Sequence, residues 1–84
     1  MDSSNLFPFS YRGQVSDAND CDSSGMYRIY GGVSNGPSFN FGVLLVFNAY
    51  GFVLQIANDV GNATPAAKFR TRNSQGVWSN WTNL

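Results

Sequence analysis

The stretch 41–57, FGVLLVFNAYGFVLQIA, decides the fold class. Two apolar runs, Phe41–Phe47 and Phe52–Ala57, flank the short segment Asn48–Gly51. Runs of this composition joined by a short loop that ends in glycine predict a β-hairpin. Both runs are apolar at successive positions, which indicates that both faces of the strands are covered. In a chain of 84 residues with a thin core, we expect another subunit to provide one of the covers.

The flanking sequence predicts more strands and almost no helix. Upstream, Gly25–Gly31 is a Tyr- and Ile-containing run bracketed by glycines, which is typical of a strand. Downstream, 67–72 alternates and places its three cations on one face, and the turn Asn73–Gly76 then leads into 77–81. No stretch has sustained helical apolar spacing. We therefore predict an all-β domain, a small antiparallel β-sheet or sandwich knob built from hairpins, with little or no helix.

The charge balance bears on the class of partner. Five basic and five acidic residues give a formal net charge of zero, which argues against nucleic acid as a partner. Lys68, Arg70 and Arg72 could imitate a groove for single strands, but a solvated face whose cations pair with aspartates is the favoured interpretation. The longest apolar run, 43–47, is far too short to span a bilayer. The first 13 residues lack the basic start and apolar core of a signal peptide, so we expect synthesis in the cytoplasm.

The inventory of reactive side chains argues against catalysis. The chain has no histidine, no glutamate and one cysteine, Cys21, so the usual general acids, bases and zinc ligands are missing. The ten serines therefore lack a histidine base. The segment Asp20–Gly25 matches the opening of an EF-hand loop, but Gly31 stands where a bidentate glutamate is required, so a turn is favoured. We predict no enzyme, no metal and no cofactor.

Both tryptophans lie near the C-terminus, in the stretch 76–84, GVWSNWTNL. In a regular strand Trp78 and Trp81 have opposite parity, so one would pack into the core beside Phe69. The other would face solvent, a partner subunit or a ligand, unless a bulge turns it inward. Exposed rings with planar amides suit sugars, which present a C–H face and a rim of hydroxyls. The ligand-binding candidates are Trp78, Trp81, Tyr30, Tyr50, Asn35 and Asn48.

Taken in order, a set of short motifs resembles the pyocin knob family, the C-terminal tip domain of phage tail fibres and tailocin fibres. They are Asp17–Asp20, Gly25–Arg28, Asn35–Pro37, the hairpin from Val43–Val46 to Val53–Ile56, and Phe69–Thr71 followed by Gly76 and Trp78–Trp81. The arginine followed by a Trp-x-x-Trp near the chain end is the strongest of them. The likeness covers residues 17–84, with 1–16 as an N-terminal segment that would be a remnant of a shaft connection.

The resemblance implies a non-enzymatic tip domain that recognises the host-cell surface, commonly by binding a bacterial polysaccharide as a homotrimer on a virion or tailocin. The alternative is a structural fibre cap and trimerisation module without its own ligand. Two features depart from the family: no long shaft precedes the domain, and Cys21 replaces an aliphatic residue.

The family residues that carry over have structural roles: Gly25 at a turn, Tyr27 and one tryptophan in the core, Gln55, and Arg70 stacked on an indole and reaching a carboxylate. We expect receptor specificity in the loops Tyr30–Asn40, Asn48–Gly51 and Asn58–Ala66.

Overall fold

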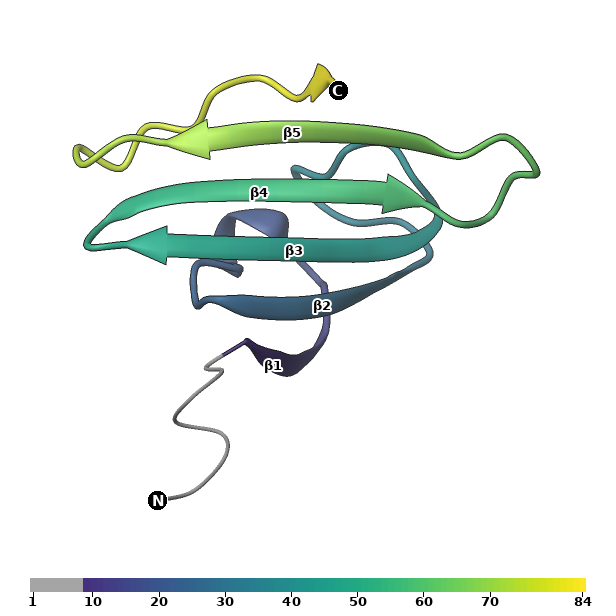
Figure 1. Cartoon of the computed structure of the whole chain (residues 1–84), viewed down its shortest axis with the longest axis horizontal. Coiled ribbons are helices and arrows are strands. Elements are labelled where there is room, and N and C mark those ends of the chain that lie inside the picture. Colours follow the sequence, from purple (N-terminus) through teal and green to yellow (C-terminus); the bar gives the residue numbers. More distant parts are fainter. Residues whose placement is uncertain (1–8) are drawn as a thin grey trace.

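The computed structural model describes residues 9–84, which form one six-stranded sheet with strands in sequence order (Figure 1). Within residues 9–84 the one helical element is a short 3-10 turn, η2 (Ala18–Asp20). The strands are β1 (Ser10–Gln14), β2 (Gly25–Tyr30), β3 (Phe41–Ala49), β4 (Phe52–Asp59), β5 (Ala66–Arg72) and β6 (Thr82–Asn83). The predicted all-β class is confirmed, as one sheet rather than a sandwich among the described residues.

The hairpin of β3 and β4 forms where the sequence predicts it. Ala49 pairs with Phe52, which leaves Tyr50 and Gly51 as a two-residue loop. Both loop residues have positive φ, 54° and 95°, as a type I′ turn requires. The side-chain Oδ1 of Asn48 accepts a hydrogen bond from the Gly51 N–H at 3.0 Å and so fixes the turn.

Strand β1 is an element that the sequence did not predict. It runs parallel to β2, with Ser10 opposite Gly25, so residues 10–14 of the segment 1–16 belong to the sheet. Gly25 has a φ of 153°, and a Cβ there would lie 2.5 Å from the Ser10 carbonyl oxygen. Gly25 therefore admits the backbone of β1, instead of relieving a turn as expected. Residues 1–8 lie outside the described part of the chain.

A one-residue bulge shapes the C-terminal edge of the sheet. Arg72 bridges Trp78 and Phe69 pairs with Thr82, so two β5 residues between these pairs face three residues, 79–81. Ser79 occupies the bulge: its N–H donates to the Thr71 carbonyl at 2.8 Å, and its hydroxyl accepts from the Thr71 N–H at 2.9 Å. The extra residue reverses parity, so Trp78 and Trp81 lie on the same face of the sheet. The prediction that a regular strand would place the two tryptophans on opposite faces is therefore wrong. The bulge, which is the exception to that expectation, places both on one face.

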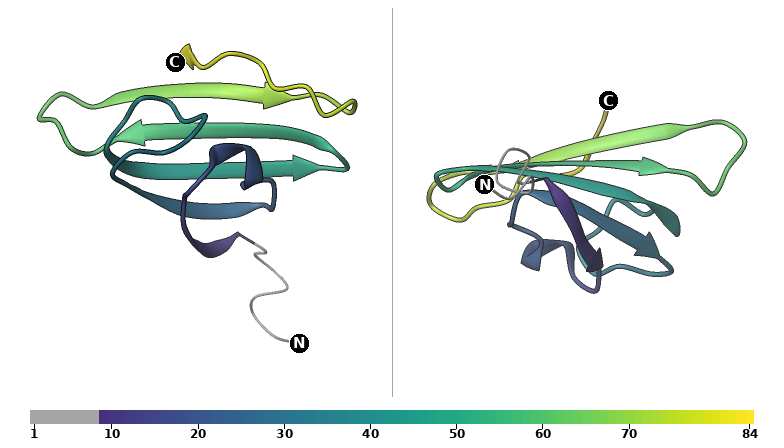
Figure 2. Two further views of the ribbon diagram at one scale, coloured as in Figure 1. Left: turned by 180° about the vertical axis from the view of Figure 1, so that it is seen from behind. Right: turned by 60° about the horizontal axis from the view of Figure 1, so that its bottom comes forward.

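The hydrophobic core lies on one face of the sheet, which we call the covered face. The segment around η2 and the connection between β2 and β3 lie across it (Figure 2, left). On the opposite face no described segment crosses β3 and β4 (Figure 1), and we call this the open face. The expected second cover is therefore absent from residues 9–84. The buried core residues are Val15, Ala18, Cys21, Ile29, Leu44, Val46, Val53 and Ala57, with Tyr27, Trp78 and Trp81 packed against them.

Candidate functional site

Two buried polar side chains organise the covered face. Gln55 is fully buried, and its Nε2 donates to the carbonyl oxygens of Ala18 at 2.8 Å and Cys21 at 2.7 Å. Its Oε1 accepts a hydrogen bond from Arg70 Nε at 2.8 Å. One amide thereby ties β4 both to the η2 segment and to β5. The hydrogen bonds of Gln55 and Arg70 are thus made within the fold.

Arg70 is sandwiched by the two indoles. Only 4% of it is exposed, and its Cζ lies 3.9 Å from the Trp78 ring centroid and 4.8 Å from the Trp81 centroid. Desolvation lowers the pKa of Arg70 to about 10, so the guanidinium remains charged at neutral pH. The predicted stacking is present, but the expected carboxylate partner is wrong because Gln55 occupies that place.

The predicted solvated face of cations is only partly correct. Arg72 pairs with Asp22, with Nη1 3.4 Å from Oδ2, as the expected pairing with aspartates requires. Arg70 is buried instead of solvated, because the C-terminal bulge folds both tryptophans over it.

The contacts of Trp81 and Asn35 continue this cluster. Trp81 Nε1 donates to the Asn35 carbonyl at 2.9 Å, and Asn35 Nδ2 donates to Asp17 Oδ1 at 2.9 Å. The Asn35 bond, with a second from the Asn19 N–H, lowers the pKa of Asp17. Trp78, Trp81 and Asn35 thus gather around Arg70, where their contacts hold the fold together.

The other three predicted ligand residues lie elsewhere and do not converge. Tyr50 is fully exposed at the tip of the β3–β4 hairpin, and Asn48 beside it donates from Nδ2 to the Asp22 carbonyl at 2.7 Å. Tyr30 lies at the opposite end of β3, edge-on to Phe41 with ring centroids 5.4 Å apart. The Arg28 Cζ lies 4.4 Å from the Tyr30 ring centroid. The six candidates therefore do not form one site.

A polar hollow that no single sequence motif indicated lies between the β2–β3 and β4–β5 connections. This loop hollow, of about 190 Å³, is lined by Ser38, Phe39, Asn40, Phe41, Asp59, Gly61 and Asn62. Two of the three loops expected to carry specificity contribute to it. The end of β4 brings Asp59 beside the start of β3, a pairing that sequence spacing alone does not reveal.

Two hydrogen bonds hold the Asp59 carboxylate in the loop hollow. Its Oδ1 accepts from the Gly61 N–H at 2.8 Å, and its Oδ2 accepts from Asn62 Nδ2 at 2.7 Å. Each carboxylate oxygen retains a further lone pair for a ligand hydroxyl. Lys68 steadies one wall, since its Nζ donates to the Pro37 carbonyl at 3.1 Å and lies 5.4 Å from the Phe39 ring centroid. The hollow thus combines aromatic rings, amides and a fixed carboxylate.

Groups for catalysis or metal binding do not gather in this way. Burial raises the pKa of the Cys21 thiol to about 11, so little thiolate exists at neutral pH. Within residues 9–84, no three side chains of the His, Cys, Asp and Glu types lie close enough together to hold a metal ion. Across the same residues, no helix has the length and apolar character needed to cross a membrane.

No protein-family model, no curated protein and no solved structure matches the chain. The likeness to the pyocin knob family therefore stays a prediction from the motifs.

Proposed function

We propose that this domain is a non-enzymatic recognition module, a tip domain of the pyocin knob kind, that binds a bacterial cell-surface polysaccharide through the loop hollow. The observation that carries the proposal is the union of Phe39 and Phe41 with Asp59, Asn40 and Asn62 in one hollow between two loops. The wider proposal, from the motif resemblance, is a homotrimer on a virion or tailocin fibre that uses no cofactor.

The chemistry of the hollow matches that of a sugar. An aromatic ring covers the apolar C–H face of a pyranose, and the planar amides and carboxylate pair with hydroxyl groups. Asp59 is held by two donors before any ligand arrives, so little side-chain freedom is lost on binding. The hollow is small, which suits one or two sugar units of a longer chain and an affinity raised by several copies on one fibre.

Adsorption to host cells and binding to a panel of bacterial polysaccharides test this function. The change Asn40→Ala removes one exposed amide from the hollow and should weaken polysaccharide binding about tenfold, the value of roughly one hydrogen bond. Asn62→Ala should weaken it further, because the Asp59 carboxylate then loses a donor. Gln75→Ala, in the exposed β5–β6 turn, is the matched control and should bind like the wild type. Equal binding by all four proteins would contradict the assignment of the hollow.

The alternative function, a structural fibre cap and trimerisation module without its own ligand, is favoured by the apolar open face. In that case the loop variants would adsorb as the wild type does, whereas deleting residues 17–84 from the fibre would abolish its assembly. Loss of adsorption from loop changes alone would reject the alternative.

A further inference from the structure

The open face is apolar across four strands. The central cross-strand row consists of Met26, Leu45, Ile56 and Phe69 on β2 to β5. A neighbouring row pairs Phe47 with Leu54, and the next pairs Ala49 with Phe52. Phe9 stacks on Phe47 with ring centroids 5.0 Å apart. Large rings remain uncovered, with 43% of Phe47 and 62% of Phe52 exposed.

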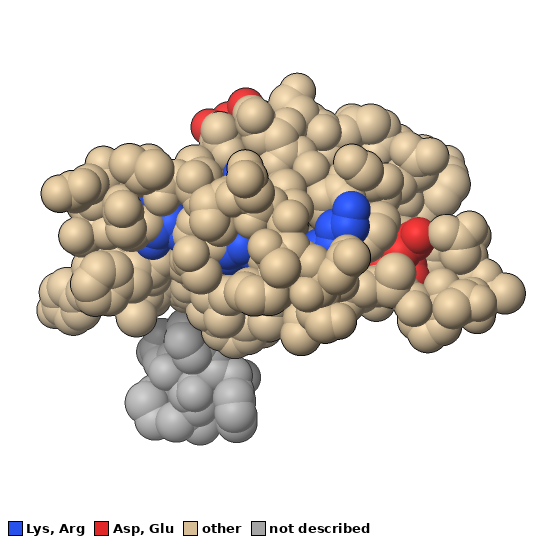
Figure 3. All heavy atoms as spheres, turned by 90° about the horizontal axis from the view of Figure 1, so that it is seen from above, with Lys and Arg blue, Asp and Glu red and all other residues tan. Residues whose placement is uncertain are grey.

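Charged side chains of β2 to β5 avoid this face. Lys68, Arg70 and Arg72 lie on the covered face with Asp59, whereas Arg28 is the one charged residue of these four strands at an open-face position. Arg28 stacks on Tyr30 at one end of the sheet. Viewed from the β5–β6 edge, Lys and Arg atoms appear as small separate patches among uncharged atoms (Figure 3). Four of the five charged residues of β2 to β5 thus lie on the covered face of the sheet.

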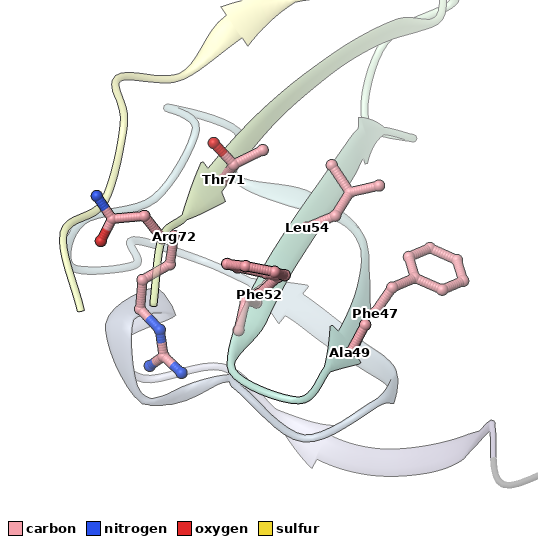
Figure 4. Close-up of a pocket in the computed structure, with 8 residues that line it drawn as sticks. Phe47, Ala49, Phe52, Leu54, Thr71 and Arg72 are labelled. Atoms are coloured by element: carbon pink, nitrogen blue, oxygen red, sulfur yellow. The ribbon is translucent and has the colours of Figure 1, made fainter. Parts of the chain in front are cut away.

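Three shallow hollows lie on the open face between these side chains. One, of about 400 Å³, is bordered by Phe47, Phe52 and Leu54, which project to the same side of the sheet (Figure 4). A second, of about 360 Å³, is lined by Val43, Leu45, Ile56 and Asn58, and the third lies beside Tyr30 and Phe41. Ridges and hollows of this kind are what interdigitate when two sheets stack face to face.

We infer that another copy of this chain covers the open face, sheet against sheet. Strands β2 to β5 average about 7.5 residues, about 25 Å of strand, and together span about 19 Å, which gives a footprint of about 480 Å². Two such faces bury about 950 Å² in total, the size of a weak interface that forms at high protein concentration. A nearly uncharged face opposes no like charges when it meets itself.

Two copies joined face to face form a two-fold dimer, so this contact is distinct from the threefold contact of the proposed homotrimer and does not depend on polysaccharide binding. Light scattering and sedimentation of the full chain from about 1 µM to about 1 mM should show a mass that rises with concentration toward that of two chains, whereas a mass of three chains would indicate a different contact. The change Ile56→Lys places a charge at the centre of the face and should weaken association at least tenfold. A monomeric wild type at about 1 mM overturns the inference.

Two further variants keep the test decisive. Thr71→Lys adds a charge at an exposed open-face position, so it should dissociate the oligomer even if Ile56→Lys fails to fold. Gln75→Lys adds the same charge in the exposed β5–β6 turn and should leave the mass unchanged. An oligomer that persists in folded Ile56→Lys and Thr71→Lys proteins would show that copies meet elsewhere. The Asn40→Ala binding assay reports on the loop hollow separately.

Discussion

The two faces of this sheet reverse the usual distribution of polarity. The covered face buries an amide and a guanidinium, Gln55 and Arg70, whereas the open face exposes phenylalanines such as Phe47 and Phe52. The difference follows from what covers each face. The irregular backbone around η2 has carbonyl groups that need hydrogen-bond donors from the sheet. The Gln55 side-chain amide donates to two of these carbonyls, those of Ala18 and Cys21. The second sheet proposed for the open face would bring side chains only, which pack best against apolar residues.

Among substitutions that test this difference between the faces, Gln55→Leu should lower the free energy of unfolding most. It leaves the carbonyl of Cys21 and the Nε of Arg70 without partners in a buried site and removes one of the two donors to the Ala18 carbonyl, so the free energy of unfolding should fall by about 3 kcal/mol. Urea unfolding followed by tryptophan fluorescence measures it. A loss under about 1 kcal/mol would mean that hydrophobic packing, and not hydrogen bonding, holds the cover to the sheet.

The tryptophans come next. Because both are half-buried against Arg70, Trp78→Ala and Trp81→Ala should each lower the free energy of unfolding by about 2–3 kcal/mol, below the value for full burial. Similar losses in the two variants, measured by thermal and urea unfolding, would agree with their shared face. A loss in only one variant would contradict it.

Trp81→Phe is a finer change at the same position. It keeps a ring over Arg70 but removes the indole donor to the Asn35 carbonyl, which should cost about 1 kcal/mol of stability. Urea midpoints with unchanged m-values provide the measurement. An unchanged midpoint would show that the hydrogen bond contributes nothing beyond the stacking.

Phe52→Ser on the open face should give the smallest effect. In dilute solution, where copies are dissociated, it should alter the free energy of unfolding by under ~0.5 kcal/mol, since no described segment packs over this side chain. At high protein concentration the same variant should lower the unfolding temperature relative to the wild type, because association stabilises the folded state. A large loss of unfolding free energy in dilute solution would show that the open face, like the covered face, stabilises the single chain.

The regular strands could be predicted from the sequence because each carries its own signal. The apolar runs of 41–57 with a glycine turn gave β3 and β4, and alternation gave β5. Strand β1 carries no such signal: its residues, Ser10–Gln14, are mostly polar and pair with β2 only because Gly25 lacks a side chain.

The candidate site was less predictable for a related reason. Phe39 and Asn40 meet Asp59 and Asn62 through the register of β3 and β4, not through nearness in sequence. Trp78 and Trp81 were recognised as important, but the bulge that determines their direction depends on hydrogen bonds between Ser79 and Thr71, which no periodicity encodes.

The bulge at 79–81 also makes the length of the last segment a constraint separate from its composition. If residues 78–82 kept their present number but paired as a regular ladder, the two tryptophans, three positions apart, would lie on opposite sides of the sheet, and one would point away from Arg70. The bulge between Trp78 and Thr82 therefore determines on which face of the sheet each indole lies. The same two tryptophans at their present spacing, without the bulge, would leave half of the guanidinium sandwich empty and add an indole to the surface through which copies are proposed to meet.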